Sequence, residues 1–273
     1  MSWEFILYDV TDNIARITVN RPEVLNSITR QVYRELDEAF TEAENDDNVI
    51  VIVVAGAGDH FGSGHDMGSE QSRLEEERNP RDRSPLGILK VMENGIYSYP
   101  REHWRNIPKP TIAMVQGYCI MASWMLACAC DIIVAAENAK FQDKTVRTWG
   151  GAQLEYPAMY VELGARKTKE YLWTGGFIDA QEACRLGIIN RVVPIEQLEK
   201  ETMEMAKTFS KIDPWGLMAS KMAINQAEEI MGKEAAIKAS SRFWCLSQSK
   251  RDRNEFKSQY SVDWVKSRDK EFE

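Results

Sequence analysis

Two glycine-containing stretches hold the residues that are best placed by type and spacing to do chemistry. The first, GAGDHFGSGHDMG at residues 56–68, directly follows a β-branched run. The second, GYCIMASWMLACACD at residues 117–131, joins small and apolar residues and ends on Asp131. A glycine-rich turn after a strand can bring main-chain N–H groups close to a ligand, because glycine has no side chain to prevent that approach. The chemistry expected here is therefore ligand binding by backbone donors.

The first stretch does not match the glycine motifs of nucleotide-binding or serine-nucleophile proteins. In the dinucleotide pattern G-x-G-x-x-G, the third glycine position falls on Phe61 or Met67. A phosphate-binding loop requires Gly-Lys-Ser/Thr, which this stretch lacks. The nucleophile elbow G-x-S-x-G also fails, because Phe61 and His65 occupy the two glycine positions around Ser63.

Composition excludes several other classes of protein. The chain has 273 residues, of which 44% are hydrophobic, which suits one large domain or a domain with an appendage. A formal charge of −8 argues against non-specific nucleic-acid binding, which requires a basic face. Gln116 and Asp131 interrupt the longest apolar stretch, so we expect no membrane span. Glu4 lies where a signal peptide would be apolar, and a cytoplasmic protein is expected.

The cysteines and histidines do not indicate a metal site. Three of the five cysteines, Cys119, Cys128 and Cys130, lie in the second glycine-containing stretch at spacings that suit neither zinc nor redox chemistry. Only three histidines are present, and they are scattered. We therefore expect buried, reduced thiols and no metal.

The pattern of apolar and turn residues predicts an α/β fold. Residues 3–8 and 14–19 are rich in β-forming residues on either side of a turn, which is typical of a hairpin. Thr29 is expected to cap a helix in which apolar residues recur at helical spacing between Val32 and Ala43. Further buried strands are predicted at 48–58, 110–117, 131–139 and 188–194.

The remaining segments are expected to be helical or irregular. Residues 69–84 are highly charged and are expected to be mobile, leading into a short amphipathic helix within 86–104 that would shape a pocket mouth. A helix, a turn and a helix capped by Asp179 are predicted across 164–186. Beyond Pro194 the chain is expected to be helical and amphipathic.

Several motifs together resemble one family. The chain resembles the crotonase (enoyl-CoA hydratase/isomerase) superfamily in the order and separation of NRPEVLNS, VVAGAGDHFGSGHDM, IPKPTIAMVQGY, ACDIIVAAENAKFQD and TGGFIDAQEACRLGIINRVVP. The resemblance implies an α/β crotonase-like superhelix of ββα units over residues 1–195 and a C-terminal helical trimerisation region over 196–273. It also implies a homotrimer or a dimer of trimers. The ligand would be an acyl-CoA substrate, with coenzyme A part of the substrate and no separate cofactor.

The resemblance places two main-chain donors in this sequence. In the family, two backbone N–H groups polarise the thioester carbonyl, and the matching residues here are His65 and Ala122. Ala122 would stand at the start of a helix, whose positive end would face the developing enolate oxygen. Met121 and Ser123 replace two of the three usual glycines, and a positive φ at any of residues 121–123 would strain the main chain.

The two glutamates that serve as acid and base in familiar hydratases are both replaced. Their positions correspond to Met125 and Thr145, which cannot exchange protons. Glu155 is our leading substitute, with a solvent-facing or helix N-terminal carboxylate as the alternative. Asp143 is second, with turn capping as the alternative.

Other residues near these motifs have weaker claims. The His65 ring could titrate in the pocket, although only its main chain is required, and Asp66 is expected to brace the turn. Glu162 and Asp131 are expected to be structural. Tyr97, Tyr99, Trp104, Trp124 and Trp149 either border the acyl pocket or pack in the core. The residues expected to contact substrate are Gly64, Asp66, Met67, Met121, Trp124, Met125, Thr145 and Trp149.

The resemblance favours an enzyme that hydrates a 2-enoyl-CoA. Isomerisation, or hydrolytic or retro-aldol C–C cleavage of a bulky or cyclic acyl-CoA, is the alternative within the same scaffold, since a single carboxylate suits isomerisation as well. A non-catalytic binding or structural protein with a crotonase fold is the alternative from another class. Met125, Thr145 and the altered glycines favour this last alternative, whereas the intact GSGHD turn and Glu155 oppose it.

Overall fold

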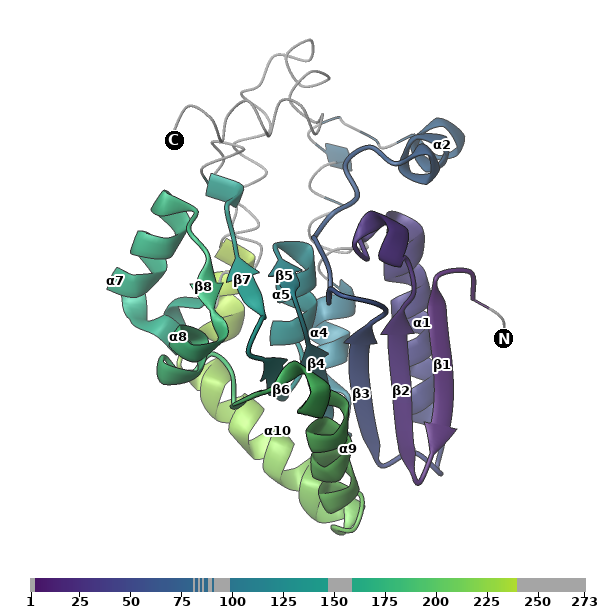
Figure 1. Ribbon diagram of the computed structural model, residues 1–273, viewed down its shortest axis with the longest axis vertical. Helices are drawn as coiled ribbons and strands as arrows, with labels where there is room; N and C mark the ends of the chain where they lie inside the picture. The colour runs from purple at the N-terminus through teal and green to yellow at the C-terminus, as the bar shows by residue number, and fades with distance from the viewer. Residues whose placement is uncertain are drawn as a thin grey trace.

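The structure is a computed structural model that describes residues 3–80, 82, 84, 86, 87, 90, 99–146 and 159–239. It is a mixed α/β fold in which helices cover both faces of the largest sheet (Figure 1). The α/β class predicted from the sequence is confirmed.

The largest sheet has six strands in the order β1-β2-β3-β4-β6-β9. Its strands are β1 (Ile6–Thr11), β2 (Ile14–Val19), β3 (Val51–Gly56), β4 (Thr111–Val115), β6 (Ile132–Ala136) and β9 (Arg191–Val193). The pair β1 and β2 is antiparallel, and every later pair is parallel. Asp12 and Asn13 form the turn of the predicted hairpin, both with positive φ.

A second, three-stranded sheet was not predicted from the sequence. It contains β5 (Tyr118–Ile120), β7 (Lys140–Gln142) and β8 (Ile178–Asp179). Strands of two or three residues are too short to show a periodic pattern, and their pairing depends on contacts distant in sequence. This sheet matters for function because β5 leads directly into the helix that begins at Ala122.

The labelled helical segments lie along the described residues. They are η1 (Pro22–Val24), α1 (Arg30–Asn45), α2 (Glu70–Arg78), α4 (Tyr99–Asn106), α5 (Ala122–Cys128), α7 (Met159–Thr174), α8 (Ala180–Arg185), η2 (Ile195–Gln197), α9 (Leu198–Phe209) and α10 (Pro214–Ile230). Two predicted caps are confirmed. Thr29 Oγ1 accepts a hydrogen bond from the Val32 N–H at 3.1 Å, and Asp179 Oδ1 accepts one from the Glu182 N–H at 2.8 Å.

The sheet separates two apolar cores. In β3, Ile52 and Val54 face the core formed with α1 and α5, whereas Val51 and Val53 face the core formed with Leu198 of α9. This alternation follows from the two-residue repeat of side chains along a strand. Figure 1 shows α1 and α9 on opposite faces of the sheet. Helix α9, which lies beyond residue 195, therefore belongs to a core of the sheet.

The charged segment 69–84 contains a helix that was not predicted from the sequence. Residues 70–78 form α2, whose N-terminus is capped by Ser69 Oγ. Arg34 forms a 2.6 Å ion pair with Glu75, and Arg30 donates a hydrogen bond to the Glu75 carbonyl at 3.0 Å. These contacts attach a charged helix to α1 without requiring apolar residues, which is why hydrophobic patterning did not reveal it.

Candidate active site

Two loops meet where the sequence placed the two main-chain donors. Loop residues 61–66 run beside β5 on one side and beside Ile28 on the other. Gly62 N–H donates to the Tyr118 carbonyl at 2.8 Å, and Ile120 N–H donates to the Gly62 carbonyl at 3.0 Å. Parallel bridges of this kind hold the loop in register with the strand that leads into α5.

On its other side, the loop is held by Ile28. Ile28 N–H donates to the Gly64 carbonyl at 2.8 Å, and Asp66 N–H donates to the Ile28 carbonyl at 3.0 Å. These two hydrogen bonds involve Gly64 and Asp66, the residues on either side of His65. They therefore fix the orientation of the His65 main chain. The His65 ring is half-buried, with its centroid 6.0 Å from that of Tyr33.

The Ala122 N–H lies at the start of α5, as predicted. An N–H group in the first turn of a helix has no acceptor within that helix, and Met121 makes no side-chain cap. A Cβ built on Gly64 would lie 3.5 Å from the Ala122 nitrogen and 3.0 Å from the Ile120 carbonyl oxygen. The main chains of the two loops therefore approach each other closely at Gly64 and Ala122.

The replaced glycine at Met121 carries the strain that was expected. Met121 has φ 49° and ψ −115°, a conformation that L-residues rarely adopt. Its N–H donates to the Gln142 carbonyl at 2.8 Å, and its carbonyl accepts from the Met125 N–H at 2.9 Å. Bonds on both sides of the residue hold this conformation against its cost.

Ser123, the other replacement, joins the two loops. Its Oγ accepts a hydrogen bond from the Gly64 N–H at 3.1 Å, and the side chain is buried. A Cβ on Gly62 would overlap this hydroxyl, so the serine fits only against glycine. The Ser123 hydroxyl is therefore directed into the contact between the loops.

Asp66 braces the turn after His65. Its carboxylate accepts hydrogen bonds from Ser69 N–H at 2.9 Å, Ser69 Oγ at 2.7 Å and Gly68 N–H at 3.2 Å, and it pairs with Arg21 at 3.0 Å. Arg21 and Asp66 side chains are almost completely buried. Burial alone would raise the pKa of Asp66, but the hydrogen bonds from Ser69, Gly68 and Arg21 outweigh burial and lower it.

The predicted acid–base carboxylates lie in different situations. Asp143 is buried, and its Oδ1 accepts the Thr145 N–H at 2.8 Å, which is the capping arrangement considered as its alternative. Thr145 is also buried, and within the described part of the chain its hydroxyl has no hydrogen-bond partner. Glu155, Trp149 and Tyr97 lie outside the described residues.

Of the three tryptophans considered for the acyl pocket, the two that are described, Trp104 and Trp124, pack in the core. Trp104 is fully buried and stacks against Phe40, with ring centroids 5.2 Å apart. Trp124 is buried against Phe141 at 5.9 Å. Asp131, expected to be structural, accepts from the Thr111 N–H at 2.8 Å and pairs with Lys221 at 2.8 Å.

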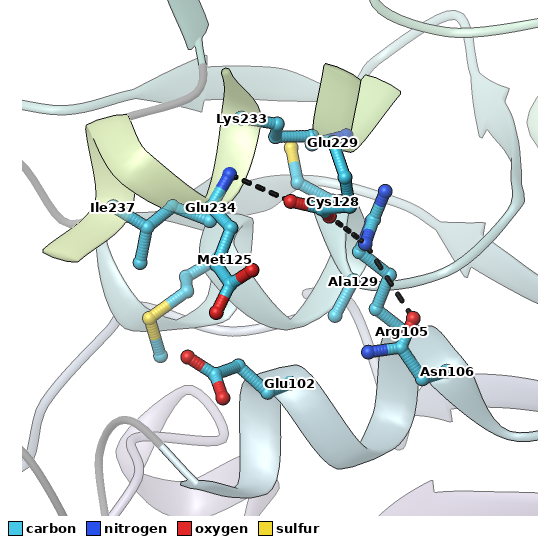
Figure 2. A pocket seen from close by; sticks show the side chains of 10 residues that line it. All are labelled: Glu102, Arg105, Asn106, Met125, Cys128, Ala129, Glu229, Lys233, Glu234 and Ile237. Atoms are coloured by element: carbon cyan, nitrogen blue, oxygen red, sulfur yellow. Dashed lines mark hydrogen bonds and ion pairs between the residues drawn. The ribbon is translucent and has the colours of Figure 1, made fainter. Parts of the chain in front are cut away.

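A cavity of about 200 Å³ lies beside Met125 (Figure 2). It is bounded by α4, α5, the end of α10 and the helical turn that follows. Its lining residues are Glu102, Arg105, Asn106, Met125, Cys128, Ala129, Glu229, Lys233, Glu234 and Ile237. Of these, the sequence analysis selected only Met125 as a site residue.

The cavity combines an apolar wall with ion pairs. Met125, Cys128 and Ala129 form the α5 wall. On the opposite wall, Arg105 pairs with Glu228 at 2.6 Å and with Glu229 at 2.7 Å. Burial alone would lower the pKa of Arg105, but these two carboxylates outweigh burial and raise it. Arg105 and Asn106 follow Glu102 by three and four residues, so the three residues share one side of a helix. This spacing is the sequence signal that could have identified this wall of the cavity.

Within the described residues, no group of His, Cys, Asp and Glu side chains is arranged to hold a metal ion. Cys119 and Cys128 are buried thiols outside any disulfide among the described residues, as expected, and burial raises the pKa of Cys119 well above its ordinary value. No helix in the described ranges has the length and apolar character required to cross a membrane.

The fold agrees with what comparison with known proteins shows. The chain belongs to the Enoyl-CoA hydratase/isomerase family, whose sequence profile matches residues 9–269. It is therefore an acyl-CoA-processing enzyme of the crotonase superfamily.

Individual relatives cover most of the chain. A Mycobacterium tuberculosis protein named as enoyl-CoA hydratase EchA13 is 36% identical over 247 residues, which are 86% of this chain and 78% of the relative. The crystal structure of a probable enoyl-CoA hydratase from Mycobacterium smegmatis has a TM-score of 0.81 at 37% identity, covering 89% of this chain and 94% of that one. An enoyl-CoA hydratase/isomerase from Xanthobacter autotrophicus has a TM-score of 0.86 at 26% identity, covering 100% and 98%.

Proposed function

We propose that this protein hydrates a 2-enoyl-CoA, using the main-chain N–H groups of His65 and Ala122 to stabilise the thioester enolate. The observation that carries the proposal is the close approach of the Gly64 and Ala122 main chains at the start of α5. Backbone donors fixed before the reaction stabilise a developing oxyanion without reorganising, which is how such a site lowers the barrier.

Proton transfer requires side chains as well. We assign one transfer to Glu155, because both usual positions, Met125 and Thr145, lack a carboxylate. The Asp143 carboxylate is occupied by the Thr145 N–H, which makes it the weaker candidate. Thr145 Oγ1 is buried, and a hydroxyl in that position can hydrogen-bond the reacting water or the acyl group.

Further aspects of the proposal follow from the family. Coenzyme A is the only cofactor-like group required, and it belongs to the substrate. The substrate contacts assigned to Gly64, Asp66, Met67, Met121, Trp124, Met125, Thr145 and Trp149 stay predictions. For Asp66 and Trp124, the observed contacts favour indirect roles, because Asp66 braces the donor loop and Trp124 packs in the core. A cytoplasmic location also stays a prediction.

A homotrimer or dimer of trimers is proposed because α10 exposes apolar residues. Trp215 is 68% exposed, Met222 59% and Ile224 63%. On an isolated surface helix the exposed side is normally polar, so this surface is expected to be covered by another copy of the chain.

The second candidate function is thioester binding without turnover. It is favoured by one observation, the absence of an ionisable side chain at both Met125 and Thr145. The family's isomerisation and C–C cleavage reactions would use the same two N–H donors.

The hydratase proposal is tested with a panel of linear, branched and aromatic 2-enoyl-CoA thioesters. Hydration removes the conjugated double bond, so its absorbance is expected to fall with at least one member of the panel. Binding of every thioester without turnover would instead support the second candidate function.

Glu155→Gln tests the assigned carboxylate on the thioester that gives the fastest turnover. Loss of a general acid or base typically lowers kcat by about 10²–10⁴-fold. Thr208→Glu, an exposed change on α9, is the control and is expected to retain full activity. An unchanged kcat in Glu155→Gln would remove this residue from the mechanism and leave the oxyanion donors untouched.

A further inference from the structure

We propose that Glu102, on helix α4, supplies the second carboxylate of the reaction and replaces the one that Met125 cannot provide. This inference rests on the hydratase function proposed above. It is carried by the cavity beside α5, in which Glu102 and Met125 face each other (Figure 2).

The cavity follows the side of α5 that begins at the proposed oxyanion donor. Residues 122, 125 and 129 are spaced by three and four positions, so they share one side of the helix. Met125 is about 4.5 Å along the axis from Ala122. A group beside the Met125 side chain is therefore one helical turn from the place where the thioester oxygen would bind.

The Met125 side chain marks where a carboxylate at this position would lie. Methionine and glutamate are both unbranched and similar in length, so the end of one approximates the end of the other. In Figure 2 the thioether end of Met125 and the carboxylates of Glu102 and Glu234 point into the same space. Glu102 thus brings a carboxylate from α4 to the place that α5 leaves without one.

Glu102 is the best available of the carboxylates in the cavity lining. Glu229 pairs with Arg105 at 2.7 Å and accepts the Glu234 N–H at 2.9 Å. Glu234 itself pairs with Lys238. Within the described parts of the chain, no ion pair or hydrogen bond engages the Glu102 carboxylate. It is therefore able to accept a proton without first losing a partner.

Glu102 would act as the base toward water. Its carboxylate removes a proton from water while the water oxygen bonds to the β-carbon of the enoyl group. The electrons of the double bond move toward the thioester oxygen, where the N–H groups of His65 and Ala122 hold the enolate. The α-carbon then takes up one proton from solvent, and Glu102 releases to solvent the proton that it removed from water. The sum is the addition of one water molecule.

Glu102→Gln tests the role with little change in size. In this variant kcat is expected to fall by about 100-fold or more, whereas the affinity for a saturated acyl-CoA stays within about twofold. Glu204→Gln, which changes an exposed carboxylate of α9 outside the cavity, is the matched control and is expected to retain kcat. The charged neighbours that face Glu102 are Arg105, Glu229, Lys233 and Glu234.

A double variant distinguishes a catalytic role from a structural one. Adding Met125→Glu to Glu102→Gln returns a carboxylate from α5, and kcat is expected to recover at least about tenfold over Glu102→Gln. Normal turnover by Glu102→Gln would overturn this inference alone. Absence of turnover by the unchanged protein would overturn the proposed function and this inference with it.

Discussion

At the scale of single residues, the two substituted glycines have different consequences. Met121 holds a positive φ that glycine would adopt without strain, and conformations of this kind cost about 1–3 kcal/mol. Ser123 adds a contact that glycine cannot make, because its hydroxyl accepts the Gly64 N–H. Ser123 therefore stabilises the contact between the two loops, whereas Met121 strains the main chain at the same place.

Ser123→Ala is expected to weaken the junction between the two donor loops. It would leave the buried Gly64 N–H without its acceptor, which lowers the free energy of unfolding by about 1–3 kcal/mol. If the hydroxyl also sets the separation of the two donors, kcat is expected to fall about tenfold while binding of a saturated acyl-CoA is unchanged. Urea unfolding and steady-state kinetics measure these effects.

Ser220→Ala is the control, since this serine lies on the surface of α10 and bonds only to the Leu217 carbonyl among described groups. Its unfolding free energy and kcat are expected to match the unchanged protein. Equal stability of Ser123→Ala and Ser220→Ala would contradict the role given to the hydrogen bond.

At the scale of elements, a histidine joins α4 to α1. The two ring nitrogens of His103 lie 2.7 Å from Asp37 and 3.0 Å from Glu44, and Trp104 Nε1–H also donates to Asp37 at 3.1 Å. The hydrogen bond with Asp37 raises the pKa of His103 above 6.5, burial opposes this, and Glu44 raises it further. Because α4 also carries Glu102, this contact supports the wall of the cavity.

The stabilisation from His103 is expected to depend on pH. The pKa of His103 is higher in the folded state than its unfolded value of 6.5. Its stabilising contribution is therefore fully present below pH 6.5, and it is lost as pH rises through the folded-state pKa. The difference in free energy of unfolding between the unchanged protein and His103→Gln is therefore expected to shrink as pH rises above 6.5. Urea titrations at each pH provide the measurement.

Thr41→Ala, on the exposed side of α1, provides the comparison. Its effect on the free energy of unfolding is expected to be the same across this pH range. A His103→Gln difference that stays constant or grows with pH would show that the imidazole is not held in its charged form.

At the scale of the whole molecule, α10 has an apolar side that the described residues leave exposed. Trp215 and Met222 are seven residues apart, so they lie on one side of the helix. Replacing both with glutamate is expected to increase the monomer fraction, because a charged side chain cannot be buried in an apolar interface without a partner. Sedimentation velocity measures the change.

Thr208→Glu on α9 again serves as the control, and its assembly is expected to match the unchanged protein. If the Trp215→Glu/Met222→Glu variant assembles like the control, the subunit interface lies elsewhere.

The sequence by itself determined much of this protein, because its signals are local. The β-branched run in β3 and the caps at Thr29 and Asp179 could be located from neighbouring residues, whereas the two proposed donors were assigned from resemblance. That residues 125 and 145 are methionine and threonine, neither of which carries a carboxylate, can likewise be read from the sequence alone.

Only the tertiary structure decided which distant residues meet. The helix at Glu70–Arg78 depends on ion pairs with α1, and the three-stranded sheet depends on pairing between short segments far apart in the chain. The bond from Gly64 to Ser123 and the position of Glu102 opposite Met125 arise from packing of separate elements. Hydrophobic periodicity reports which side of an element is buried, but the packing partner is set by how the elements assemble.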